Sequence, residues 1–186
     1  MGCMKQLDGG GVDRVMDDLD DVRIRPYSLT DDERLRCMRL SPFSLYLRFF
    51  SGTPRVPEAY VRALHGMDHW DHDALVAILD EEILGVAEYV RDRHDPARAE
   101  VAVLVTDDWQ RHGLARPLIT FLAQLAARRG ITEFDADVML QNRGGLCAVR
   151  SGWPSARAVR TGGSAHFRLP LPVPPPVPKA LLRDSG

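Results

Sequence analysis

The fold is decided by residues 101–115, which read Val101-Ala102-Val103-Leu104-Val105-Thr106-Asp107-Asp108-Trp109-Gln110-Arg111-His112-Gly113-Leu114-Ala115. The run from Glu100 to Thr106 is almost continuously apolar, which predicts a strand that is buried on both faces. After a short polar turn, leucines recur at helical spacing as far as Gly130, a residue type that commonly ends a helix. The stretch therefore predicts a buried strand that passes through a turn directly into a helix over residues 113–129.

The turn between that strand and that helix is a candidate anion site. The first backbone N–H groups of a helix have no intrahelical partners and lie at the positive end of the helix dipole. Such an end binds phosphate or pyrophosphate readily. Gly113 lets an anion approach the backbone closely, and Arg111 and His112 can add positive charge. A single glycine at a helix start is more often only a cap, so the turn alone leaves both interpretations open.

The segments outside this stretch predict the elements of an α/β domain. Val22-Arg23-Ile24-Arg25 alternates as a half-buried strand does. Thr30-Asp31-Asp32-Glu33 has the form of a capping box with Thr30 as N-cap, and Ser41-Pro42 is a second helix start. The other predicted elements are a helix over 57–64, a hairpin of strands 74–79 and 83–90, a strand over 131–139, a short helix over 146–150, and final strands over 156–159 and 166–169. This order predicts a mixed, mostly antiparallel sheet flanked by helices, in the α/β (α+β) class.

Length and composition indicate one globular domain, because 186 residues with 45% hydrophobic and 27% charged side chains suffice for a single core. The net charge of -2 gives no reason to expect nucleic acid or an anionic membrane as a partner. Cys3, Cys37 and Cys147 are widely spaced and form no CxxC pair, which favours a reducing, cytoplasmic environment. No apolar run approaches the ~20 residues of a membrane span.

We expect the ordered domain over residues 22–171, between two tails. Residues 1–21 contain three consecutive glycines and an acidic run, which predicts a flexible segment. Residues 172–186 are rich in proline, which predicts an extended tail.

A family resemblance sharpens the interpretation of the turn. Gln110-x-x-Gly113-x-Ala115, following a valine-rich strand, resembles the coenzyme A signature of the GNAT acetyltransferases, usually Gln/Arg-x-x-Gly-x-Gly/Ala. The order of elements over residues 22–171 is also similar to that fold. The resemblance implies a sheet splayed between its fourth and fifth strands, with acetyl-CoA as co-substrate in the opening. The backbone groups expected to bind it are those of Val103, Leu104 and Val105 for the pantetheine arm and Gln110, Arg111, His112, Gly113, Leu114 and Ala115 for the pyrophosphate.

A narrower resemblance lies upstream. The segments Leu40-Ser41-Pro42-Phe43-Ser44-Leu45-Tyr46-Leu47-Arg48-Phe49-Phe50-Ser51 and Asp68-His69-Trp70-Asp71-His72-Asp73-Ala74-Leu75-Val76-Ala77 look like the catalytic domain of bacterial Pat-type protein-lysine acetyltransferases. That resemblance implies transfer of an acetyl group to a protein lysine. It also implies a stand-alone catalytic domain, because 186 residues leave no room for the regulatory domain often fused to those enzymes.

Glu100 is the predicted general base. A lysine ammonium, with a pKa of ~10.4, must lose a proton before its nitrogen can attack, so the enzyme needs a base near the thioester. Glu100 opens the strand expected to carry the cofactor, and it matches the glutamate that serves as base in the Pat-type enzymes. We expect burial beside that strand to raise its pKa. Glu88 on the preceding strand is the reserve candidate, and an ordinary ion pair between Glu100 and Arg98 is the structural alternative.

Two features near the C-terminal end depart from the family pattern. Many GNAT enzymes use a tyrosine to protonate the departing thiolate, and the corresponding position here is Ala148. Asn142 is expected to touch the cofactor arm, but Gly144 and Gly145 should weaken the helix that follows it, since glycine costs roughly 1 kcal/mol per position.

Two groups of side chains have a structural interpretation and a functional one. Phe43, Tyr46, Leu47 and Phe50 recur at helical spacing and are expected to face the core, with Tyr46 or Arg48 lining an acceptor groove as the alternative. Three histidines and three aspartates between residues 65 and 73 fit no standard zinc spacing, so we expect no metal there.

Three functions remain open from the sequence. The leading prediction is acetylation of a protein lysine. The alternatives are acetylation of a small amine and binding of acyl-CoA without catalysis, as a sensor. We expect a monomer or a homodimer.

Overall fold

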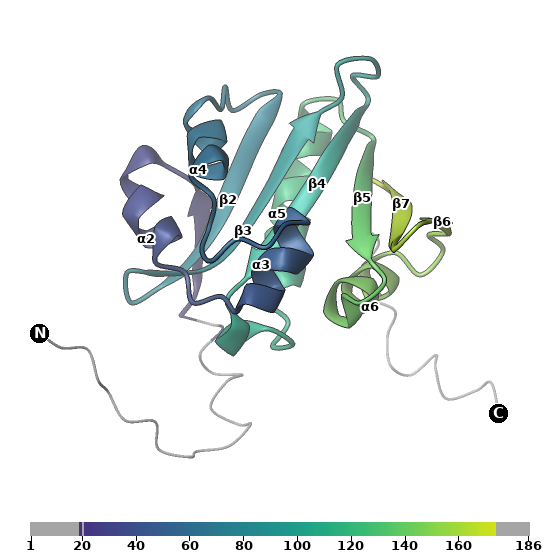
Figure 1. Ribbon diagram of the computed structural model, residues 1–186. Coiled ribbons are helices and arrows are strands. Elements are labelled where there is room, and N and C mark those ends of the chain that lie inside the picture. Colours follow the sequence, from purple (N-terminus) through teal and green to yellow (C-terminus); the bar gives the residue numbers. More distant parts are fainter. Residues whose placement is uncertain (1–18, 20, 174–186) are drawn as a thin grey trace, which may run out of the picture.

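The computed structural model describes residue 19 and residues 21–173. The expected tails, 1–21 and 172–186, lie almost wholly outside the described residues. The described chain forms one seven-stranded sheet flanked by helices (Figure 1). The elements in chain order are β1 (Arg23–Pro26), η1 (Leu29–Asp31), α2 (Asp32–Arg36), α3 (Pro42–Phe49), α4 (Glu58–His65), β2 (His72–Leu79), β3 (Glu82–Arg91), β4 (Arg98–Val105), η2 (Asp107–Trp109), α5 (Ala115–Arg128), β5 (Glu133–Met139), α6 (Arg143–Gly152), β6 (Ala158–Thr161) and β7 (Ser164–Pro170).

The sheet has the order β1-β2-β3-β4-β5-β7-β6, and every neighbouring pair is antiparallel except β4 and β5. The parallel pair is short, because only residues 98–100 of β4 align with residues 133–135 of β5. Beyond that point β5 stays paired with β7 along its whole length, while β4 stays with β3. The two strands therefore diverge toward their C-terminal ends, as Figure 1 shows, and the predicted splay between the fourth and fifth strands is confirmed.

Two hydrophobic clusters cover the two faces of the sheet. On one face, Leu118 and Leu122 of α5 are fully buried against Phe134 and Tyr89, and Trp153 at the end of α6 joins the same cluster. On the other face, the short N-terminal helices pack against the sheet with the buried side chains Leu35, Leu45, Val61, Leu64, Val76 and Leu104. The middle parts of strands β2 and β3 are buried on both sides, which explains the apolar runs 74–79 and 83–87 within them.

Strand β4 is less buried than its sequence predicted. Ala99 and Leu104 are the buried residues within it, whereas Glu100 is exposed. The prediction of burial on both faces was wrong for this strand, because its β5 side opens beyond Glu100.

The first helical turn begins two residues earlier than predicted. Asp31, and not Glu33, closes the cap: its Oδ2 accepts the backbone N–H of Ser28 at 2.9 Å, and Arg25 holds the same carboxylate at 2.6 Å. The ion pair buries Asp31 and fixes it as the capping side chain. Thr30, the predicted N-cap, only shares a hydrogen bond with Ser28 Oγ at 2.7 Å.

The aromatic stripe of α3 was assigned to the wrong side of the helix. Phe43, Tyr46 and Phe50 are 54%, 36% and 51% exposed, and Leu45 is the buried residue instead. The start of α3 is as predicted, because Ser41 Oγ accepts the backbone N–H of Ser44 at 3.1 Å.

Among the described residues, no helix is both long and apolar enough to cross a membrane.

Candidate active site

The turn between β4 and α5 presents a row of free backbone donors. Arg111 and Gly113 both have positive φ, 66° and 87°, and turns with left-handed residues can direct successive amides toward an anion. Within the described residues, no carbonyl or side chain accepts a hydrogen bond from the amides of residues 111–115. Free amides ahead of a helix, here one of fourteen residues, are suited to binding an anion.

His112 supports the same interpretation. Its Nδ1 atom is buried and has no partner among the described residues, although its ring lies edge-on to Trp109 with centroids 6.4 Å apart. A buried polar atom without a partner is costly. An oxygen of a phosphate group at the turn would supply that partner, so this residue fits the predicted cofactor. Leu114 is fully buried and can offer only its backbone.

The Gln110 side chain binds protein groups, whereas the backbone amides that follow it in the signature are free. Its Nε2 lies within hydrogen-bond distance of Ser44 Oγ at 3.0 Å, of the Val105 carbonyl oxygen at 3.1 Å and of Asp107 Oδ1 at 3.1 Å. Its backbone N–H already donates to the Asp107 carbonyl at 3.3 Å. Gln110 therefore ties the turn to α3 and to the end of β4, and the amides beyond it remain available.

The β5-facing edge of β4 also carries free backbone groups. The N–H of Thr106 donates to the Leu84 carbonyl on β3 at 2.9 Å. Because the backbone groups of a strand alternate between its two edges, Leu104 also faces β3, whereas Val103 and Val105 face β5. No described β5 residue aligns with β4 beyond Glu100, so the edge at Val103 is open. Leu104 contributes its side chain to the core instead.

Glu100 lies where the opening begins. It is the last β4 residue aligned with β5, opposite Asp135, and its side chain is exposed. The expected desolvation is therefore not present. The alternative of an ion pair with Arg98 is also wrong, because Arg98 binds Asp135 at 2.5 Å. The Glu100 side chain makes no hydrogen bond or ion pair with the described residues and is free to meet a substrate.

Glu88 is the buried carboxylate of this region. It is only 8% exposed and lies on β3, opposite Ala102 of β4. Arg48 of α3 donates to one of its oxygens, and His72 Nε2 lies 3.0 Å from the other. Burial raises the pKa of Tyr60, and the nearby Glu88 charge raises it further. Glu88, the second candidate for the general base, is thus bound to protein side chains through both of its carboxylate oxygens.

Asn142 caps α6, which spans ten residues and is longer than the predicted 146–150. Its Oδ1 accepts the backbone N–H of Gly145 at 2.8 Å. The cap offsets part of the expected cost of the paired glycines. Ala148 lies within this helix, so the helix brings no phenol to the opening.

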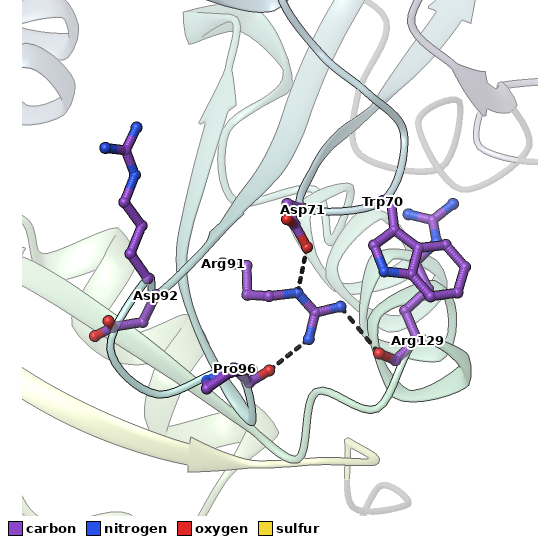
Figure 2. A pocket seen from close by; sticks show the side chains of 7 residues that line it. Trp70, Asp71, Arg91, Asp92, Pro96 and Arg129 are labelled. Atoms are coloured by element: carbon purple, nitrogen blue, oxygen red, sulfur yellow. Dashed lines mark hydrogen bonds and ion pairs between the residues drawn. The ribbon is translucent and has the colours of Figure 1, made fainter.

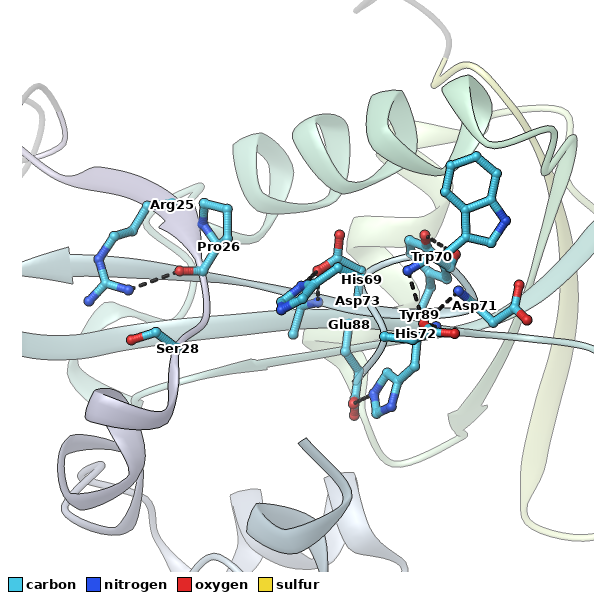
Figure 3. A network of polar contacts seen from close by, with 12 residues as sticks. Arg25, Pro26, Ser28, His69, Trp70, Asp71, His72, Asp73, Glu88 and Tyr89 are labelled. Atoms are coloured by element: carbon cyan, nitrogen blue, oxygen red, sulfur yellow. Dashed lines mark hydrogen bonds and ion pairs between the residues drawn. The ribbon is translucent and has the colours of Figure 1, made fainter. Parts of the chain in front are cut away.

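Several of the histidines and aspartates between residues 65 and 73 contact neighbouring protein groups (Figure 3). Asp68 Oδ1 accepts the backbone N–H groups of Trp70, Asp71 and His72 at 2.8–3.0 Å. Buried Asp73 binds Arg129 at 2.6 Å. Across residues 21–173, no three His, Cys, Asp or Glu side chains gather as metal ligands would.

A shallow hollow lies near the start of β4, away from the turn (Figure 2). Arg91 fills its floor, donating to Asp71 Oδ1 at 2.7 Å and to the Arg129 carbonyl at 2.9 Å. All three nitrogens of the Arg91 guanidinium already donate to protein oxygens, so Arg91 is not available to a ligand there.

A mixed sheet splayed between its fourth and fifth strands, with an amide-rich turn at the opening, is the arrangement expected of an acetyltransferase, and the comparison with known families agrees. The acetyltransferase (GNAT) family model matches residues 40–146, and the chain belongs to this family.

Individual relatives fit the same assignment. The acetyltransferase PA5475 of Pseudomonas aeruginosa is 31% identical over 130 residues, which cover 65% of this chain and 69% of that protein. Acetyltransferase Pat of Mycolicibacterium smegmatis is 33% identical over 109 residues, 56% of this chain but only 32% of Pat. The crystal structure of the GNAT domain of S. lividans PAT has a TM-score of 0.74 at 28% identity, covering 81% of this chain and 90% of that one.

Proposed function

We propose that this acetyltransferase transfers the acetyl group of acetyl-CoA to the side-chain amine of a protein lysine, with Glu100 as the general base. One observation carries the proposal: a free carboxylate and a row of free amides lie at the two ends of the same open strand edge. Glu100 stands where β4 begins to separate from β5, and the amides of residues 111–115 follow the C-terminal end of β4.

The donor substrate fits this arrangement along its length. The amides of residues 111–115 and His112 Nδ1 would hold the pyrophosphate. The backbone at Val103 would bind the pantetheine arm as a strand partner. Val105 can offer its N–H but not its carbonyl oxygen without competition, because Gln110 already occupies that oxygen.

The reaction needs one proton acceptor before attack. A lysine side chain is an ammonium near pH 7, since its pKa is ~10.4. Glu100 takes a proton from it, and the neutral nitrogen forms a bond to the acetyl carbonyl carbon. The carbon–sulfur bond breaks and its electron pair leaves on sulfur. The nitrogen gives up a second proton, so that one proton ends on the thiol and the other passes to solvent.

The similarity to Pat and the open surface beside the site both favour a protein acceptor. Phe43, Tyr46 and Phe50 of α3 leave apolar surface exposed, and Gln110 ties the start of that helix to the cofactor turn. A small-amine acceptor remains the second candidate. Ala148 in place of a tyrosine is the feature that favours a non-catalytic acyl-CoA sensor.

The test is thiol release from acetyl-CoA with a panel of lysine peptides, proteins and small amines. Glu100→Gln should lower turnover by roughly 10²-fold or more, with acetyl-CoA affinity nearly unchanged. Glu33→Gln, at an exposed position on α2, is the matched control and should match the wild type. Normal turnover of the Glu100 variant at neutral pH would remove Glu100 from the mechanism. Tight binding without release to any acceptor would favour the sensor.

A further inference from the structure

The contacts of Glu88 fix the protonation pattern of His72. The carboxylate of Glu88 is buried, and an ionised carboxylate only accepts hydrogen bonds. Arg48 takes one oxygen and compensates the charge, leaving the other oxygen for His72 Nε2 at 3.0 Å (Figure 3). The proton of a neutral His72 therefore lies on Nε2, and Nδ1 carries the lone pair.

The bare nitrogen of His72 is accessible. Nδ1 has no hydrogen-bond partner among the described residues, and it is not among their buried unpartnered atoms. The side chain as a whole is 17% exposed. An imidazole oriented by a carboxylate through one nitrogen, with the other nitrogen open, is the arrangement of a proton acceptor.

Strand register places His72 on the same face of the sheet as Glu100. His72 of β2 lies opposite Val90 of β3, and Val90 lies opposite Glu100 of β4. Directly opposed residues project to the same face, and neighbouring strands are ~4.8 Å apart, so about 10 Å separates the two backbones. Val90 between them is 46% exposed, so the row faces open surface. A substrate amine and a bridging water can fill that span.

We propose that His72 is a second proton acceptor for the substrate amine and that it shares the proton with Glu100. Glu88 holds His72 in the tautomer whose Nδ1 carries no proton. The inference rests on the proposed function of this site. The proton that leaves the ammonium is shared, through a bridging water, between Glu100 and His72 Nδ1, so that the two groups act as one unit. The resulting imidazolium stays bound to Glu88 and later releases the proton to solvent. Glu88 is a positioning residue in this scheme.

Other groups around His72 do not supply the same function. Arg48 of α3 and Tyr60 of α4 face Glu88. The Asp68 carboxylate accepts the backbone N–H of His72. The groups to be considered in any pH profile of His72 are therefore Glu88, Arg48, Tyr60, Asp68 and Glu100.

The test compares His72→Gln with the wild type in lysine-peptide acetylation from pH ~7 to ~9.5. Glutamine keeps an N–H donor toward Glu88 and removes the basic nitrogen. Turnover at pH ~7 should fall roughly 10-fold. The deficit should shrink as pH rises toward the lysine pKa of ~10.4, because more of the amine is already neutral. A purely structural role would give a deficit that does not depend on pH. Combined with Glu100→Gln, the loss should be smaller than the product of the two single losses.

The controls separate this inference from the proposed function. His65→Gln changes another histidine–carboxylate pair, with Asp32, and should leave turnover unchanged. An active wild type with a pH-independent deficit, or none, in His72→Gln overturns the inference alone. A wild type that binds acetyl-CoA but acetylates no amine overturns both. Nitrogen-15 NMR of the wild-type imidazole adds a test that needs no variant: a proton on Nδ1 in place of Nε2 overturns the inference.

Discussion

Gln110 donates its side-chain amide to the carbonyl oxygen of Val105 across 3.1 Å, so the end of β4 and the turn after it are held as one unit. The same nitrogen reaches Ser44 on α3 at 3.0 Å. The helix that packs against β4 and the turn that presents the free amides are thus joined by one side chain. Because protein contacts occupy the Gln110 side chain, we expect it to affect a bound ligand through the geometry of its neighbours.

Gln110→Glu should therefore weaken acetyl-CoA binding. The variant places a carboxylate against the Val105 carbonyl oxygen and the Asp107 carboxylate and loses its N–H donors. We expect this to disturb the turn at a cost of about 1 kcal/mol, or ~5-fold in Kd. Calorimetric titration with acetyl-CoA measures the change. Gln124→Glu adds the same charge at an exposed position of α5 and is the control. Equal affinities for the two variants would show that the Gln110 contacts do not shape the site.

Gly113→Ala should weaken acetyl-CoA binding through the backbone. A Cβ at Gly113 meets no atom within 4 Å, so its φ of +87° is the source of any effect. A left-handed conformation costs an alanine about 1–2 kcal/mol, and relieving it turns the adjacent amides away. Gly130→Ala, at φ +84° and also in open space after α5, carries the same strain far from the turn. Both variants should lose similar stability, and Gly113→Ala alone should lose affinity. Unchanged affinity would separate the turn from the cofactor.

The order of strands and helices could be predicted because it depends on local periodicity and caps. The hairpin of β2 and β3 and the Ser41 cap of α3 follow from residues close together in the chain. The splayed sheet followed from resemblance. The orientation of the α3 stripe could not be predicted, because helical spacing shows that one face is apolar but not what lies opposite it.

For the same reason, the turn of the candidate site could be predicted from the sequence, but the surroundings of Glu100 and Glu88 could not. The turn from Arg111 to Ala115 is a local feature, and the structure gives it free amides. The exposure of Glu100 depends on where β5 leaves β4, and the contacts of Glu88 join α3, β2 and β3. Residues so distant in sequence give no local signal. The segment from Asp68 to Asp73 was noted for its two histidines, and one of them, His72, contacts Glu88 in the structure.

Asp68→Asn should change stability in a pH-dependent way. Backbone N–H groups of His72 and Trp70 lower the pKa of Asp68 to about 2. An unfolded aspartate has a pKa of ~3.9, so the folded state gains stability above that pH and loses it as pH falls through about 2. Because Asp68 is exposed, we expect a deficit of about 1 kcal/mol at pH ~7. Urea unfolding of wild type and variant should converge as the pH falls from ~4 to ~2. Asp80→Asn in the hairpin turn should show no such convergence, and a pH-independent deficit for Asp68→Asn would contradict the charge-based account.

Gly144 and Gly145, adjacent in α6, should respond to alanine with opposite signs. A Cβ at Gly144 would lie 3.7 Å from Asn142 Oδ1, an ordinary contact. Gly144→Ala should therefore stabilise the protein by up to ~1 kcal/mol through helix propensity. A Cβ at Gly145 would lie 2.9 Å from Asn142 Nδ2 and 3.0 Å from Val138 Cγ1, so the cap must move. Losing that cap costs about 1 kcal/mol, and the close contact with Val138 adds to this cost, so the sum exceeds the propensity gain and Gly145→Ala destabilises the protein. Urea denaturation of the two variants measures the difference, and equal midpoints would show that the contacts of Asn142 do not require a glycine at position 145.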